Sequence, residues 1–185
     1  MKSWGSAVGL VLGVTACGAA GGGGADPAAA PGVKLETLGV SSTSFSANGE
    51  IPVDYTCDGA NRSPELAWSA PPRGTQSFAI VVDDPDAPSG TFTHWIVYNL
   101  GADARSVPEA ADPATLGGAS GLSDSKRPMY GGPCPPRLEI HHYNFHVFAL
   151  NAPLVIGPEP DRDAIDAAMS GHVLAVGTLV GAFSH

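Results

Sequence analysis

Two short segments of the sequence gather side chains that can bind ligands or move protons. In the first, an apolar run ends in Asp83, Asp84 and Asp86, and His94 lies on the next apolar run. Crowded carboxylates repel one another, which raises a carboxyl pKa where water is excluded. A strand that returns beside the first would bring His94 next to these acids, which favours a site. A solvated acidic turn is the alternative interpretation.

The second segment is a proline-rich loop followed by a strand with several histidines. The loop reads Gly132-Pro133-Cys134-Pro135-Pro136, and its prolines restrict the backbone. Side chains alternate between the two faces of a strand, so His141 and Tyr143 share one face. His142 and His146 share the other face. We therefore expect His141 and Tyr143 to point into one pocket.

Metal and catalytic chemistry fit this pattern poorly. His142 and His146 are four residues apart, which on a strand separates them by about 13 Å, too far to share a zinc ion. The sequence has no Gly-x-Ser-x-Gly nucleophile motif and no glycine motif for nucleotide phosphates. We therefore expect no metal, no cofactor and no catalytic residue, and we favour binding over turnover.

Short apolar runs separated by turn residues must position both segments. The sequence has 24 Gly and 17 Pro among 185 residues, which argues against a long-helix or coiled-coil protein. The pattern instead indicates an antiparallel β-sandwich or barrel. Residues 161–169 carry the one helical pattern. The candidate strands are residues 51–55, 65–68, 77–82, 93–99, 143–150 and 174–180.

The charge balance limits the classes of partner. Lys and Arg number 9 and Asp and Glu number 18, which gives a formal net charge of −9 without any basic run. Binding to a phosphate backbone requires a basic face, so nucleic acid is not an expected partner. A hydrophobic content of 43 % also excludes a wholly disordered chain.

The N-terminus predicts export and membrane attachment. Residues 1–16 have the charge and the short apolar stretch of a signal peptide. The sequence Val14-Thr15-Ala16-Cys17 resembles the bacterial lipobox, which implies a lipid on Cys17; a plain secretory signal is the alternative. Residues 17–32 would then form a Gly/Ala/Pro-rich tether, and residues 33–185 the folded domain. We expect an extracytoplasmic lipoprotein of a bacterial cell envelope that contacts the membrane only through this lipid.

Two cysteines, Cys57 and Cys134, remain once Cys17 is set aside. An extracytoplasmic compartment permits a disulfide between them. The sequence does not show whether they lie close enough in space, so a pair of free thiols is the alternative.

Taken together, the two segments resemble the phosphatidylethanolamine-binding protein (PEBP) family, and within it the bacterial Raf-kinase-inhibitor-like branch. The first segment matches through Asp84-Pro85-Asp86-Ala87-Pro88 and His94-Trp95, the second through Gly132–Pro136 with His141 and Tyr143. Flanking matches are Tyr55-Thr56-Cys57-Asp58-Gly59, Ser63-Pro64 and Gly171-His172-Val173-Leu174-Ala175. The likeness runs in order over residues 35–183, nearly the whole expected domain.

The resemblance implies both a fold and a site. The fold would be a sandwich of two antiparallel sheets with a Greek-key core and a few peripheral helices, one of them near the C-terminus. The site would be a small pocket at one end of the sandwich that holds phosphate-like anions. Carried over by position, its residues are Asp84, Asp86, His94, His141 and Tyr143, with Gly132, Pro135 and Pro136 at the rim.

The function that this implies is binding of phosphate or a phosphorylated, headgroup-type ligand. Imidazole N–H groups, the Tyr143 hydroxyl and backbone N–H groups of the glycine-proline loop would donate to the anion. Asp84 or Asp86 would orient a histidine, or one of them would be protonated and donate to the ligand. Two alternatives are a protein-interaction module that inhibits a protease or modulates a kinase, and a weak phosphoester hydrolase.

One stretch departs from the family pattern. Relatives carry glycines between the paired prolines and the His-x-Tyr strand, whereas this chain has Arg137-Leu138-Glu139-Ile140. A link without glycine is less able to adopt a positive φ, so we expect a rim of different shape. Either Arg137 would add a cation at the pocket mouth, or Glu139 would weaken anion binding.

Overall fold

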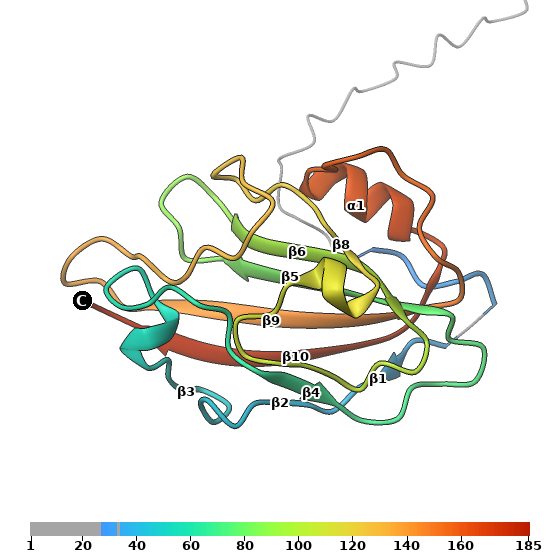
Figure 1. Cartoon of the computed structure of the whole chain (residues 1–185), viewed down its shortest axis with the longest axis horizontal. Coiled ribbons are helices and arrows are strands. Elements are labelled where there is room, and N and C mark those ends of the chain that lie inside the picture. The colour runs from blue at the N-terminus through green and yellow to red at the C-terminus, as the bar shows by residue number, and fades with distance from the viewer. Residues whose placement is uncertain (1–26, 33) are drawn as a thin grey trace, which may run out of the picture.

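The computed structural model describes residues 27–32 and 34–185, which fold into a mainly β domain (Figure 1). The expected signal peptide at residues 1–16, the expected lipidation site Cys17 and most of the expected tether lie outside the described residues. Within the described part of the chain, no helix has the length and apolar character that crossing a bilayer requires.

A large sheet forms the body of the domain. Its strands lie in the order β1 (Glu36–Thr37), β10 (Val173–Phe183), β9 (His141–Leu150), β5 (Ser77–Asp84), β6 (Phe92–Gly101) and β8 (Ala119–Ser120), and β3 (Gly49–Glu50) also pairs with β10. The long strands pair antiparallel, as expected. The short β1 and β3 instead run parallel to β10, so this edge of the sheet is mixed.

A smaller sheet and one helix cover the two faces of the large sheet. The smaller sheet consists of β2 (Val40–Ser41), β4 (Leu66–Trp68) and β7 (Ser106–Val107). Along β5, Phe78 and Ile80 pack in the same core cluster as β4, while the alternate residues Ala79 and Val81 pack with Ile165 of the helix. The strand is therefore buried on both faces, which explains its continuous apolar run.

The predicted helix at residues 161–169 is confirmed as α1 (Arg162–Met169). The Asp161 carboxylate caps its first turn by accepting a hydrogen bond from the Ala164 N–H at 3.1 Å. Ile165 and Met169 lie on one face of the helix and are fully buried against the sheet. Two short 3₁₀ helices, η1 (Val53–Tyr55) and η2 (Pro113–Leu116), complete the helices of the described residues.

The predicted strand at residues 51–55 is wrong. Its second half is the 3₁₀ helix η1, which the Thr56 hydroxyl closes by donating to the Val53 carbonyl at 2.9 Å. Pro52 also lacks the N–H with which a strand residue joins a ladder. The other predicted strands are confirmed. However, β9 begins two residues before the predicted start at 143, so His141 belongs to the sheet.

One end of the large sheet collects the residues singled out from the sequence. In the register, Asp84 of β5 pairs with Phe92 of β6, and His141 of β9 pairs with Phe183 of β10. At the opposite end of β10, Val173 forms a bridge with Ala29. Figure 1 shows the loop before β9 and the C-terminus on the left, and the first described residues, in blue, on the right.

Candidate functional site

Most of the expected site residues meet in one cavity at the His141 end of the large sheet. Its volume is about 440 Å³, within the range of small-molecule sites. The connection from β5 to β6 supplies Ala87 and Pro88 to its wall, and the first residue of β6 supplies Phe92. The expected residues that line it are Asp84, His94, Gly132, Pro135, Pro136 and His141.

His141 is held between two carboxylates. Its Nδ1 lies 2.7 Å from Oδ2 of Asp84, and its Nε2 lies 3.2 Å from Oε2 of Glu139. A carboxylate at hydrogen-bond distance from each ring nitrogen favours the doubly protonated ring, in which both nitrogens donate. Burial acts to lower the pKa of His141, but the bonds to Asp84 and Glu139 outweigh it and raise that pKa above its ordinary value.

His94 is the opposite case, a neutral imidazole. Its Nδ1 donates to the Gly131 carbonyl at 2.8 Å, which leaves Nε2 as the unprotonated nitrogen. The ring packs edge-on against Phe92 and Tyr143, with ring centroids 4.9 and 5.3 Å away. Burial lowers the pKa of His94 below its ordinary value, although the bond to Gly131 opposes this shift. The protein thus shifts the pKa values of the two cavity histidines in opposite directions.

Tyr143 lies beside His94 but is not among the residues that line the cavity, where it was expected. The side chain is fully buried, and its hydroxyl has no hydrogen-bond partner among the described residues. Burial, with the nearby Asp84 carboxylate, raises the pKa of Tyr143 above its ordinary value, so the hydroxyl stays protonated. An unpartnered buried hydroxyl costs about 1–3 kcal/mol, and a group that accepts a hydrogen bond from it would remove that cost.

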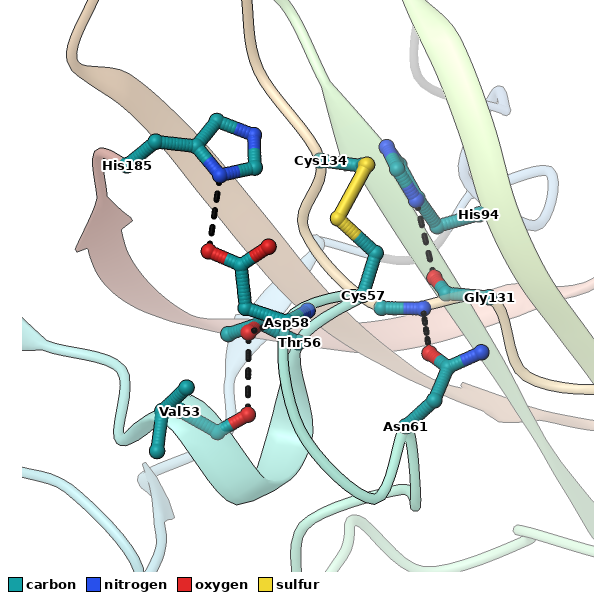
Figure 2. Close-up of a disulfide and its surroundings, with 10 residues drawn as sticks. Val53, Thr56, Cys57, Asp58, Asn61, His94, Gly131, Cys134 and His185 are labelled. Atoms are coloured by element: carbon teal, nitrogen blue, oxygen red, sulfur yellow. Dashed lines mark hydrogen bonds and ion pairs between the residues drawn. A yellow bond between two sulfur atoms is a disulfide. The ribbon is translucent and has the colours of Figure 1, made fainter. Parts of the chain in front are cut away.

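The cavity rim is clamped to the segment around η1. Cys57 and Cys134 form a disulfide, the pairing that the sequence left open. Beside the disulfide, the Gly132 N–H donates to Oδ1 of Asn61 at 2.7 Å (Figure 2). The Cys57 N–H also donates to the Pro133 carbonyl at 3.0 Å. Covalent and hydrogen bonds therefore fix the loop that carries the rim.

The backbone of this loop is packed too tightly to serve the ligand. A Cβ at Gly132 would lie 2.4 Å from the Tyr55 carbonyl oxygen, so this position requires glycine. The Gly131 N–H donates to the His94 carbonyl at 3.1 Å, and the Gly132 N–H donates to Asn61. The N–H groups of Gly131 and Gly132 therefore have partners within the protein, and the expectation of backbone donors from this loop is not met by these two residues.

The three neighbouring acids have separate partners, so their charges do not crowd one another. Asp84 faces the cavity, while Asp83 accepts from Arg162 at 2.9 Å on the other face of the sheet. Burial would raise the pKa of Asp83, but its hydrogen bonds, including that from Arg162, hold the pKa below its ordinary value. Asp86 accepts from the backbone N–H and from Nδ1 of His142 at 2.8 and 2.7 Å.

Asp86 is partly exposed and does not line the cavity, so the expectation that it would lie in the pocket is wrong. The hydrogen bonds from His142 lower the pKa of Asp86, which keeps it ionised and unable to donate to a ligand. Its own N–H donates to Oδ1 of Asp84 at 2.8 Å, so Asp86 shapes the turn beside the site.

Residues 137–140, the stretch without glycine, differ from the sequence predictions in two ways, in their backbone conformation and in the position of Arg137. Leu138 adopts a φ of +71°, and the Glu139 N–H donates to the Pro136 carbonyl at 3.1 Å, which closes a tight turn. A branched residue can thus take the conformation that favours glycine. Arg137 is exposed and does not line the cavity. Glu139 instead reaches His141, a specific contact that the sequence reasoning did not predict.

Comparisons with known proteins agree with this geometry. The family model described as phosphatidylethanolamine-binding protein matches residues 41–184. A UPF0098 protein of Aquifex aeolicus is 43 % identical over 78 % of this chain and 86 % of its own length. A Mycobacterium tuberculosis protein whose name, LppC, classes it as a lipoprotein is 38 % identical over 94 % of both chains.

Solved structures also share the fold. A PEBP homologue from Chlamydia trachomatis has a TM-score of 0.75 and 32 % identity, and the match covers 81 % of this chain and 99 % of that one. YbcL of E. coli, described as a member of the PEBP family, has a TM-score of 0.75 and 29 % identity over 80 % of this chain and 98 % of its own. On the matched residues, the relatives and the shared fold, the chain belongs to the phosphatidylethanolamine-binding protein family.

Proposed function

We propose that the cavity binds a small anion, the phosphate of a phosphorylated small molecule or headgroup. The family to which the chain belongs is one of binding proteins. The observation that carries the proposal is the His141 imidazolium, which Asp84 holds in the cavity wall of a protein with a net charge of −9. A cation fixed at a cavity wall in so acidic a chain supports local binding of a negative group.

The donors around the cavity suit an anion in strength and direction. Hydrogen bonds with one charged partner contribute about 1.5–3 kcal/mol, more than neutral ones. Asp84 engages Nδ1 of His141, so the Nε2–H is the charged donor that a ligand can meet. The Tyr143 hydroxyl is a neutral donor nearby. A ligand oxygen would then replace the Glu139 carboxylate at Nε2.

Calorimetric titration of the purified protein with inorganic phosphate and with phosphoethanolamine tests the proposal. We expect saturable binding that His141→Gln abolishes, because the cationic donor is lost. His142→Gln is the matched control, since His142 is the next residue but contacts Asp86 outside the cavity. Absence of saturable binding by the unchanged protein would contradict the proposal. Release of phosphate from phosphoethanolamine would indicate a hydrolase instead.

We infer in addition that the protein is a membrane-anchored lipoprotein of the cell envelope. The support is the lipobox-like sequence that ends at Cys17 and the similarity to LppC over 94 % of both chains. Mass spectrometry of the N-terminal peptide should find a chain that begins at Cys17 and carries acyl groups. Cys17→Ala should move the protein to the soluble fraction. An unmodified N-terminus at another residue would contradict the inference.

A further inference from the structure

A second cavity lies directly beside the first. Its volume is about 340 Å³, and it shares Ser125, Gly131 and Gly132 with the lining of the first cavity. Glycines carry no side chain, so the shared wall is thin where these two residues form it. The two cavities are therefore neighbours, separated by these residues.

The second cavity offers hydrogen-bond donors without protein partners. The Arg127 guanidinium lines it and has no hydrogen bond or ion pair among the described residues. Asn61 also lines it, and its Oδ1 accepts from the Gly132 N–H at 2.7 Å, which fixes the amide group. The Nδ2 of Asn61, seen at the lower right of Figure 2, is left with two N–H donors and no acceptor among the described residues.

The charge around the second cavity is unusual for this chain. Acidic residues outnumber basic ones by 18 to 9, yet no Asp or Glu is among the lining residues. Among residues 27–32 and 34–185, Arg127 is the only Lys or Arg that lines either cavity. The nearest acid along the chain, Asp124, accepts from the Thr93 N–H at 2.7 Å. The cavity therefore combines a free cation with a free amide donor.

We propose that the second cavity is a subsite for a second anionic group of the ligand. The ligand class is then a small molecule with a phosphate at one end and a carboxylate or second phosphate a few bonds away. A guanidinium suits both groups because its planar fork donates two parallel hydrogen bonds. This inference rests on the proposed function, since the first phosphate would bind at His141.

Two ligands that differ in one group test the inference. Glycerol 3-phosphate and 3-phosphoglycerate have the same length and differ only in a hydroxymethyl or a carboxylate at the far end. Calorimetric titration of the unchanged protein should show about fivefold tighter binding of 3-phosphoglycerate, the factor that an exposed ion pair of about 1 kcal/mol provides. Arg127→Gln should reduce this ratio to about one, and Arg127→Lys should restore part of it because the charge returns without the fork.

The matched control removes an equal charge far from both cavities. Arg73 is exposed and precedes Ser77, where β5 begins, about 23 Å from Asp84 at the other end of that strand. Arg73→Gln should keep the preference for 3-phosphoglycerate. If neither ligand binds to any form of the protein, the proposed function and this inference both fail. If both ligands bind equally well to the unchanged protein, or if Arg127→Gln keeps the preference, only the subsite is refuted.

Discussion

The Glu139 carboxylate occupies the position at which an anion would meet His141, so its removal should strengthen ligand binding. Oε2 of Glu139 lies 3.2 Å from Nε2 of His141, while Asp84 holds the other ring nitrogen at 2.7 Å. The perturbation is Glu139→Gln, which keeps the shape of the side chain and removes its charge. A ligand would then no longer have to displace a carboxylate from the imidazolium.

The exposure of the two acids gives the expected magnitude. The Glu139 side chain is 56 % exposed and that of Asp84 only 5 %, so Glu139 is the partner that a ligand can displace. An exposed ion pair contributes about 0.2–1 kcal/mol. At about 1.4 kcal/mol per factor of ten, Glu139→Gln should tighten binding by up to about fivefold. This gain in affinity should be the same for a monoanionic and a dianionic phosphate group, because each displaces the same contact between Glu139 and His141. If Glu139 instead weakened binding by general charge repulsion, its removal would favour the dianion more strongly.

Calorimetric titration at about pH 7.5, where a phosphate monoester is a dianion, measures this factor. The probes are phosphoethanolamine, a monoester, and glycerophosphoethanolamine, a monoanionic diester. NMR titration of the His141 ring gives a second measurement, since loss of the Glu139 contact should lower the pKa of His141. Glu36→Gln is the control, because Glu36 pairs with Ala175, about 26 Å along β10 from the partner of His141. Equal affinities for Glu139→Gln and the unchanged protein, with an unchanged His141 pKa, would refute the reasoning.

Three other changes test how the site is built. Because the pKa of His141 is raised in the folded protein, the stability from its charge is fully present below about pH 6.5 and is lost as pH rises through the raised pKa. Urea unfolding of the unchanged protein at a series of pH values should show this loss of stability. If His141→Gln shows the same dependence of stability on pH, the loss does not come from His141. Reduction of the Cys57–Cys134 disulfide, whose residues are 77 apart, should lower the free energy of unfolding by about 2–4 kcal/mol. Denaturant unfolding with and without a reductant measures this difference. A midpoint that does not respond to reductant would be inconsistent with this. Gly132→Ala should destabilise the protein by about 1–3 kcal/mol, because the new Cβ would lie 2.4 Å from a backbone oxygen. Gly131→Ala is the control: its Cβ would have its nearest contact at 3.7 Å, so this variant should melt at nearly the original temperature. Equal melting temperatures for the two variants would argue against the close packing.

The central residues of the site could be predicted because strand alternation is a local rule. His141 and Tyr143 share a buried face of β9, as a period of two residues requires. The contact of Glu139 with His141 is not covered by this rule, because Glu139 follows a tight turn and lies before β9. The cap at Asp161 is equally local, which is why the helix pattern after it predicted α1 correctly.

Contacts between residues far apart in the chain could not be predicted in this way. Arg162 lies 79 residues after its partner Asp83, and Asn61 lies 71 residues before Gly132. Such pairs depend on how strands and loops are arranged in space, which no short pattern encodes. Arg127 lies on a loop without any hydrophobic period, so only the fold reveals that it lines a cavity beside His141.

The bridge between Ala29 and Val173 fixes where the N-terminal segment leaves the domain. β10 runs from Val173 to Phe183, which at the usual rise of a strand is a distance of about 33 Å. The first cavity lies at the Phe183 end, next to His141. Ala29 and the cavity therefore lie near opposite ends of β10.

This arrangement orients the cavity if Cys17 carries a lipid. Ala29 is twelve residues after Cys17, a length of chain that spans at most about 43 Å. To turn the cavity toward the bilayer, this connection would have to run back along about 33 Å of the domain, which would use most of its reach. If Cys17 carries a lipid, the cavity would therefore lie at the end of the domain farther from the anchoring bilayer, where a dissolved ligand could reach it.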